Sequence, residues 1–251
     1  DPIWSERASP FQWIGPKRMR PPGIKFEDLP PIDLVLISHN HYDHLDEQTI
    51  LDLHRDHDPK FIMPLGVERF FHDHDIDTTT HLDWWQQHDI GQKLSLTAVP
   101  ARHFSGRGLF DRNKTLWCGY VLHTSFGNIY FAGDTGYGDF LTEIGQKCGP
   151  IHTSLLPIGA YKPRWFMHAI HMSPEEAVKA HKDLQSQQSI AIHFGTFPMA
   201  DDGMYEGVEE LQEACKLDDI SSKEFRVLDE GETISQEKGT SAKTVKAAVS
   251  Q

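Results

Sequence analysis

The sequence predicts a layered α/β fold in which short strands outnumber helices. Short apolar runs recur along the chain, and their length is that of strands in a folded sheet. Helical patterns lie between some of these runs, so the two kinds of element interleave. Chemically reactive side chains stand directly after several of the strands, which is where a layered α/β protein builds its functional sites.

The strands are predicted from alternation and from turns. Residues 94–99 alternate with period two. The runs 120–123 and 128–132 flank a turn at 124–127, which is typical of a hairpin. Further strands are expected at residues 34–37, 61–63, 154–158 and 190–193.

The helices are predicted from their start signals. A helix is expected from about residue 46 to residue 54, with Asp46 as its N-cap. Ser173-Pro174-Glu175-Glu176 predicts the start of another helix, because Ser at the N-cap, Pro at the first position and Glu at the third form a capping box. A further helix is expected at 208–215.

The remaining segments set the domain organisation. The first thirty residues are rich in Pro, Arg and aromatic residues and predict an irregular arm. We expect one domain over 1–234 and a disordered polar tail over 235–251. The chain begins at Asp1 without an initiator Met or a signal sequence, so we expect further residues to precede it.

Composition excludes several function classes. The formal charge of −13 argues against nucleic acid as a partner and gives no support for electrostatic docking on anionic lipid. The three cysteines form no CxxC pair, which favours a reducing compartment. No apolar stretch approaches ~20 residues, so no membrane span is predicted, and a cytoplasmic or peripheral inner-membrane location is expected.

A cluster of potential metal ligands follows the strand at 34–37. His39, His41, Asp43 and His44 fall within six residues. In an extended segment His39, His41 and Asp43 can face one way, and a turn at Asp43 brings His44 to the same side. Such side chains are what zinc accepts. A solvated polar loop is the alternative, which this density of ligands directly after a core strand disfavours.

Three other strand ends offer ligands of the same kind. His103, Asp134 and His193 each follow an apolar run. Taken singly, a histidine at a strand end is more often structural, and Gly133-Asp134-Thr135 is more often a simple turn. Their recurrence behind the His39–His44 motif favours one shared metal centre.

Together these motifs resemble the metallo-β-lactamase superfamily. Longer segments resemble the N-acyl-phosphatidylethanolamine-hydrolysing phospholipases D, from about Asp1 to Ile234. These segments are Ser38-His39-Asn40-His41-Tyr42-Asp43-His44-Leu45-Asp46, Arg112-Asn113-Lys114-x-Leu116-Trp117, and residues 157–167, 174–178 and 192–197. The resemblance implies a four-layer αββα sandwich. The family's first β-hairpin is expected before Asp1, and the missing eukaryotic-type extension suggests a bacterial-type member.

The resemblance also implies two Zn²⁺ ions per chain, with other divalent metals as the alternative. It assigns His39, His41 and His103 to one ion. It assigns Asp43, His44 and His193 to the other, with Asp134 bridging the two. The division is chemically sensible, because the first site is rich in neutral nitrogen and the second gains a carboxylate.

The implied function is that of a dinuclear zinc phosphodiesterase. Such an enzyme hydrolyses N-acyl phosphatidylethanolamine-like phospholipids to N-acylethanolamine and phosphatidic acid. A hydroxide shared by the metals is the nucleophile, and Asp43 orients it. A phospholipid substrate, peripheral membrane contact and a homodimer are the implied partners. Two alternatives stay open: a lactonase or other non-lipid hydrolase on the same dimetal site, and a metal-binding scaffold without turnover.

Four residues outside the ligand set are candidates for the reaction. His171 lies two residues before the cap Ser173, where free N–H groups favour anions, so it can contact the phosphate or protonate the leaving alkoxide. A surface histidine is the alternative. Tyr42, Tyr161 and Arg164 flank ligand-bearing strand ends and are expected to bind substrate, although a structural ion pair is equally compatible with Arg164.

Overall fold

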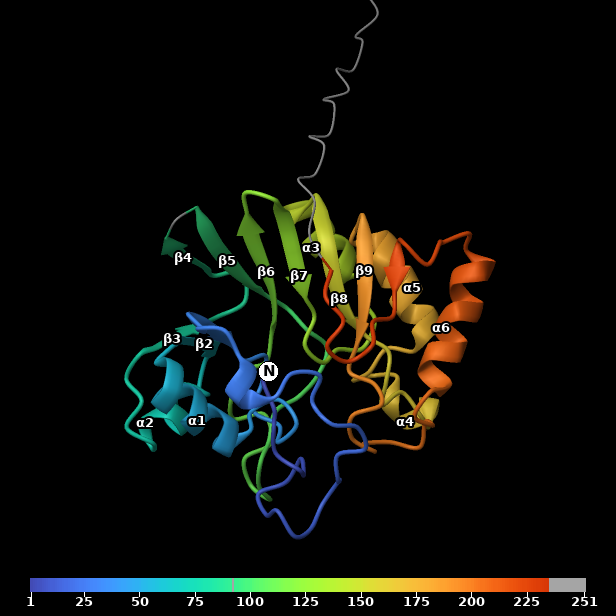
Figure 1. Ribbon diagram of the computed structural model, residues 1–251. Coiled ribbons are helices and arrows are strands. Elements are labelled where there is room, and N and C mark those ends of the chain that lie inside the picture. The colour runs from blue at the N-terminus through green and yellow to red at the C-terminus, as the bar shows by residue number, and fades with distance from the viewer. Residues whose placement is uncertain (92, 235–251) are drawn as a thin grey trace, which may run out of the picture.

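Two β-sheets pack face to face in the protein, and helices cover the outer face of each (Figure 1). The computed structural model describes residues 1–91 and 93–234. The predicted tail at 235–251 lies outside the described residues. This arrangement confirms the expected αββα sandwich.

The first sheet is parallel and has the order β1-β2-β3. The second sheet is mixed and has the order β10-β9-β8-β7-β6-β5-β4. Its strands β4 to β7 pair antiparallel, and β7 to β10 pair parallel. The strands are β1 (Leu34–Leu36), β2 (Lys60–Pro64), β3 (Thr79–Leu82), β4 (Gln87–Gly91), β5 (Leu94–Val99), β6 (Gly119–Thr124), β7 (Gly127–Phe131), β8 (Ile151–Pro157), β9 (Gln188–Ile192) and β10 (Phe225–Arg226).

Helices flank the two sheets on opposite sides, with α1 and α2 on one side and α5 and α6 on the other (Figure 1). The helices are α1 (Glu47–His57), α2 (Glu68–His72), α3 (Phe140–Cys148), α4 (Arg164–Met167), α5 (Pro174–Asp183), α6 (Glu206–Leu217) and a 3₁₀ turn η1 (Phe26–Asp28). Among the described residues, none of these helices is long and apolar enough to cross a membrane.

Strand alternation explains the layers. In β2, Phe61 and Met63 join the core under α1 and α2, whereas Ile62 joins the core between the sheets. In β6, Tyr120 faces the other sheet and Val121 faces the helices of the second sheet. Both faces of these strands are therefore buried, as the period of two requires for central strands.

Several predicted elements are confirmed, with shifted ends. The strand at 94–99 has the predicted bounds, and α5 carries the complete capping box at Ser173. Helix α1 continues beyond its predicted end at residue 54. It ends at His57, because the next residue, Asp58, has a left-handed φ of 46°. Asp46 is the N-cap by position, but its carboxylate accepts hydrogen bonds from Thr49 and Ser5 and makes no cap bond.

The short elements β3, β4, α2, α3, α4 and β10 were not predicted. The strand predicted at 190–193 begins earlier and ends before His193, whose φ of 56° turns it out of the sheet. The first thirty residues form the predicted irregular arm, apart from η1 and a bridge between Arg7 and Lys17. The arm lies over the carboxyl ends of the strands, because Met19 N–H donates to Thr196 O just after β9.

Candidate metal centre

The loop after β1 brings its four candidate ligands to the junction of the two sheets. Ile37 N–H donates to Ile62 O in the first sheet, and Cys118 N–H donates to Ser38 O just before β6 of the second. The N–H groups of His44 and Leu45 then both donate to His41 O, at 3.1 and 2.8 Å. This turn swings His44 back beside the residues that precede it, as the sequence predicted.

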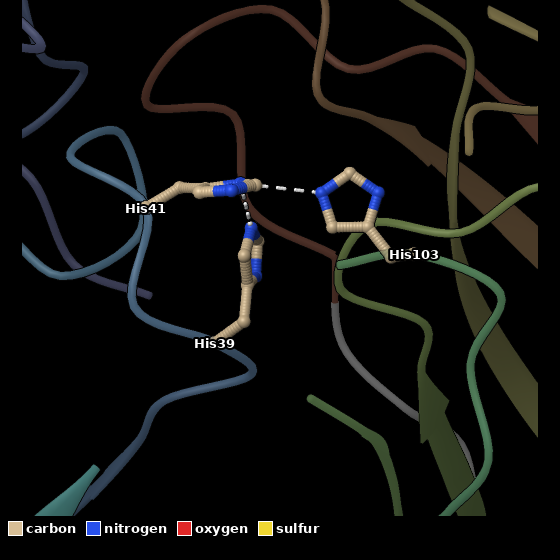
Figure 2. A group of neighbouring side chains, drawn as sticks. All are labelled: His39, His41 and His103. Carbon is tan, nitrogen blue, oxygen red and sulfur yellow. Dashed lines mark hydrogen bonds between the residues drawn. The ribbon is translucent and has the colours of Figure 1, made fainter. Parts of the chain in front are cut away.

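Three histidines form the first half of the centre (Figure 2). His39 Nε2 lies 2.8 Å from His41 Nδ1, and His103 Nε2 lies 3.2 Å from the same atom. His39 and His103 are buried. Two loops from different sheets therefore aim three ring nitrogens at one point, a geometry suited to a borderline cation.

Asp43, His44, Asp134 and His193 form the second half. Asp43 Oδ2 lies 3.3 Å from His44 Nε2 and 3.4 Å from His193 Nε2. Asp134 Oδ2 lies 3.1 Å from His44 Nε2 and 3.7 Å from His103 Nε2. The Asp134 carboxylate therefore touches both halves.

A glycine allows this approach of Asp134. Gly133 has a φ of 58°, and a Cβ at this position would lie 2.5 Å from Ser38 Cβ. The chain after β7 can pass this close to the β1 loop only without a side chain. The Gly-Asp-Thr turn is thus tied to the geometry of the centre.

Partners outside the centre hold three of the histidines in one tautomer. His44 Nδ1 lies 2.7 Å from Asp1 Oδ2, His103 Nδ1 lies 2.9 Å from Ile170 O, and His39 Nδ1 lies 2.8 Å from Ser38 Oγ. Each Nδ1–H is used as a donor, which leaves Nε2 as the ring nitrogen that faces the centre. Such partners orient metal-binding histidines and raise their basicity.

Asp1 is the functional residue that sequence reasoning missed. Its side chain is 9% exposed and accepts hydrogen bonds from Ser38 N–H at 2.6 Å and from Ser38 Oγ at 2.5 Å, besides the bond from His44. The contact spans 43 residues in sequence, and no local pattern around Asp1 signals it.

Electrostatics differ between the two halves. Burial lowers the pKa of His41 and of His103 to about 4, so both rings are neutral at pH 7. Burial also opposes a proton on His44, but Asp134 and Asp43 raise its pKa to about 10. Burial favours the protonated forms of both carboxyls, yet the histidines beside them, His44 foremost for Asp43 and His193 foremost for Asp134, hold their pKa values well below the usual range.

The donor set fits a divalent metal. His44 Nε2 and Asp134 Oδ1 are buried without a hydrogen-bond partner, although polar atoms in protein interiors are nearly always paired. The ligand atoms within each half all lie within 4.8 Å of one another. The three cysteines lie in the apolar cores, so nitrogen and carboxylate oxygen are the donors that these groups offer.

Comparisons with known proteins agree with this geometry. The model of the β-lactamase superfamily domain matches residues 1–194. An N-acyl-phosphatidylethanolamine-hydrolysing phospholipase D of Caenorhabditis elegans is 38% identical over 92% of the chain and 68% of its own length. The chain belongs to the metallo-β-lactamase superfamily, in the family of these phospholipases D. It is therefore a metal-dependent hydrolase by family.

Two further similarities extend this finding. An uncharacterised protein of Mycobacterium tuberculosis is 42% identical over 88% of the chain and 60% of its own length. The isothiocyanate hydrolase from Delia radicum gut bacteria has a TM-score of 0.71 at 19% identity, over 93% of this chain and 90% of that one. The latter likeness shows the shared fold. The chain spans about two thirds of the length of the two sequence relatives.

His171 lies at the edge of the metallo-β-lactamase centre. It is 7% exposed, its Nδ1 lies 4.0 Å from Asp134 Oδ2, and its ring stacks on that of His193. Burial lowers the pKa of His171 to about 3, so its ring is neutral at pH 7. Nδ1 is buried without a hydrogen-bond partner. A neutral ring in this place suits a hydrogen bond to an anion better than proton donation, and its catalytic role stays a prediction.

Of the three predicted substrate contacts, Tyr42 and Arg164 bind groups of the protein itself, and Tyr161 is buried with a hydroxyl that has no hydrogen-bond partner among the described residues. Tyr42 OH donates to Arg107 O, and Tyr161 is 1% exposed. The Arg164 guanidinium donates to Glu176 Oε2 at 2.7 Å and to His171 O at 2.9 Å. Arg164 thus ties the turn that carries His171 to helix α5. Contact of these side chains with substrate stays a prediction.

An apolar cavity opens beside the second half of the centre. It has a volume of about 490 Å³, and Asp43, His44 and His193 line one side of it. Its other walls are largely apolar and come from the ends of β7 and β9, the arm and the segment before α6. Among these residues are Ile3, Met19, Phe131, Ile192, Phe197 and Met204.

Proposed function

We propose that this chain is a phosphodiesterase of the phospholipase D type. It would hydrolyse N-acyl phosphatidylethanolamine-like phospholipids to N-acylethanolamine and phosphatidic acid. The observation that carries the proposal is the apolar cavity of about 490 Å³ that adjoins Asp43, His44 and His193. A site that joins metal-ligating groups to an apolar cavity suits a substrate with a phosphate and a hydrocarbon chain. The name of the Caenorhabditis elegans relative gives independent support.

We propose that two Zn²⁺ ions occupy the centre. His39, His41 and His103 would hold one ion. Asp43, His44 and His193 would hold the other, with Asp134 between them. Bound there, the metals would supply an activated water and neutralise charge on the phosphoryl oxygens. The protein's part is to aim the nitrogen and carboxylate donors inward, with His41 and His103 neutral and with a proton on His44 that metal would displace.

Two side chains would act on the substrate directly. Asp43 Oδ2 reaches both His44 and His193, so it can orient the attacking water while it binds metal. The neutral His171 ring would donate a hydrogen bond to a phosphoryl or leaving-group oxygen, because its Nδ1 has no partner in the protein. Phosphoryl transfer depends largely on such positioning and charge stabilisation.

The assay that tests the proposal measures metal content and turnover together. Purified protein is loaded with Zn²⁺, its metal per chain is determined, and hydrolysis is followed on N-acyl phosphatidylethanolamine and on a panel of lactones. We expect phosphodiester cleavage to dominate. Faster lactone turnover would show that the protein is a lactonase. A fully loaded protein that cleaves neither substrate would show that it is a metal-binding scaffold without turnover.

The role of His171 is tested by substitution at constant metal content. His171→Ala should lower kcat, and His171→Gln should restore part of it, because the amide keeps an N–H donor. His168→Ala is the matched control, since His168 is an exposed histidine of the same segment. Unchanged kcat and an unchanged pH–rate profile in His171→Ala would remove His171 from the reaction.

A further inference from the structure

Charge is unevenly distributed over three segments that border the metal centre. We call residues 7–26, 101–117 and 161–172 the rim. The rim holds eleven of the chain's 24 Lys and Arg but one, Asp111, of its 37 Asp and Glu. The rest of the chain holds the other 13 basic and 36 acidic residues. Arg20, Lys162 and Arg164 form ion pairs with Glu residues outside the rim. The exposed cations of the rim are Lys17, Lys25, Arg102, Arg112 and Lys114.

The same segments expose most of the large apolar side chains. Among the described residues, fourteen large hydrophobic residues are exposed, and nine of them belong to the rim. Trp13 is 74% exposed, Leu109 91% and Trp165 80%. The others are Phe11, Ile14, Met19, Ile24, Phe110 and Phe166. Clustered exposure of this kind marks an interaction surface rather than scattered surface residues.

The three segments meet at the centre. In the first, Arg20 Nε donates to Gly195 O, two residues after the ligand His193. The second contains the ligand His103, whose Nδ1 donates to Ile170 O in the third. Figure 1 shows the blue arm, the green loop before β6 and helix α4 together at the lower end of the molecule. Cations and apolar side chains thus lie on segments that border the centre.

We propose that the rim docks the protein on the surface of an anionic phospholipid bilayer. Aromatic side chains favour the interface between lipid head groups and hydrocarbon, and Lys and Arg near an anionic surface each strengthen binding about fivefold. Nucleic acid would pair with the cations but would leave aliphatic side chains such as Ile14 and Leu109 in water. A bilayer accommodates both kinds of side chain.

Docking in this orientation brings the metal centre to its substrate. The inference rests on the proposed phospholipid substrate, whose phosphate lies in the head-group layer. With the rim on that layer, the segments that carry His103 and His171 face the phosphates. Loops and the short helix α4 supply the contact surface in this arrangement.

Vesicle sedimentation of the metal-loaded protein tests the proposal without any turnover. Vesicles of phosphatidylcholine with phosphatidylglycerol should bind the protein, vesicles of phosphatidylcholine alone should bind it weakly, and added salt should weaken binding. Lys17→Gln and Lys114→Gln should each reduce binding about fivefold. Lys216→Gln should leave it unchanged, because this exposed lysine lies in α6 outside the rim.

The apolar contribution needs its own pair of variants. Leu109→Ser combined with Phe110→Ser should weaken vesicle binding at least about tenfold, because two exposed apolar side chains no longer enter the interface. Leu217→Ser is the matched control, since Leu217 is 86% exposed outside the rim. Binding by the rim variants that equals binding by the controls would overturn the proposal.

A soluble substrate separates this inference from the proposed function. Turnover of bis(4-nitrophenyl) phosphate should be the same in wild type and rim variants, whereas turnover of vesicle-bound N-acyl phosphatidylethanolamine should fall with vesicle binding. Rim-dependent binding without phosphodiester cleavage would refute the proposed function and leave the docking surface standing. Full phosphodiester turnover, together with vesicle binding that does not depend on the rim, would support the proposed function and refute the docking surface.

Discussion

Asp1→Asn should weaken metal binding although Asp1 lies outside the two ligand sets proposed for the metals. In the wild type, Asp1 Oδ1 accepts from Ser38 N–H and Oδ2 accepts from His44 Nδ1. An asparagine must keep its oxygen on Ser38 N–H, so its NH₂ group faces His44 Nδ1. His44 Nδ1 must then accept a hydrogen bond from this NH₂ group. The ring proton therefore moves to Nε2, the atom that should bind metal. The substitution thus favours the wrong tautomer.

The expected loss is 10–100-fold in Zn²⁺ affinity, or about 1.4–2.8 kcal/mol, as for other partners of metal-binding histidines. Asp1→Ala should cost no more than Asp1→Asn, because a side chain that is merely absent does not impose a tautomer. If Asp1 had a purely structural role, Asp1→Ala would lower Zn²⁺ affinity more than Asp1→Asn, since asparagine keeps the shape of aspartate.

The measurement is competition for Zn²⁺ between the metal-free protein and a chromophoric chelator, with folding checked by circular dichroism. Asp77→Asn is the control, because it makes the same change at a side chain that is 92% exposed. Wild-type affinity in a folded Asp1→Asn protein would refute the tautomer argument.

Three further predictions address the centre. Asp134→Ala should empty both halves and abolish hydrolysis, because Asp134 touches both; near-normal metal content by elemental analysis would contradict this. Gly133→Ala should lower the free energy of unfolding by at least about 2 kcal/mol in urea, through strain at φ 58° and a clash with Ser38, whereas Gly91→Ala at φ 98° meets no neighbour and should cost less. Burial lowers the pKa of His44, but Asp134 raises it to about 10, so metal must displace a proton. Zn²⁺ affinity should therefore rise with pH between about 6 and 9, and a titration independent of pH would show that His44 binds no metal.

The ligand loop was predictable because its signal is local. His39, His41, Asp43 and His44 follow a core strand within six residues, and one turn brings them together. The capping box at Ser173 is local in the same sense, and it appears as predicted. In both cases the residues that interact are close in sequence, so spacing alone carries the information.

The features that escaped prediction depend on long-range packing. β3 (Thr79–Leu82) is short and mostly polar, and it becomes a strand because β2 offers it a parallel partner. Asp1 gains its role from a contact with His44 across 43 residues. The basic rim was hidden because a total charge carries no information about where the charges lie. In each case the role of the residues can be recognised only when the fold is known.

The spread of ligands along the chain also sets when the centre can form. Asp43 and His193 are separated by 150 residues. At ordinary rates of synthesis, the ribosome needs about 8–30 s to add that stretch. During this time a growing chain displays the His39–His44 loop without its later partners, open to whatever metal the cell offers. The complete set of side chains for metal binding is therefore present only after release, when β9 has formed and His193 lies beside Asp43.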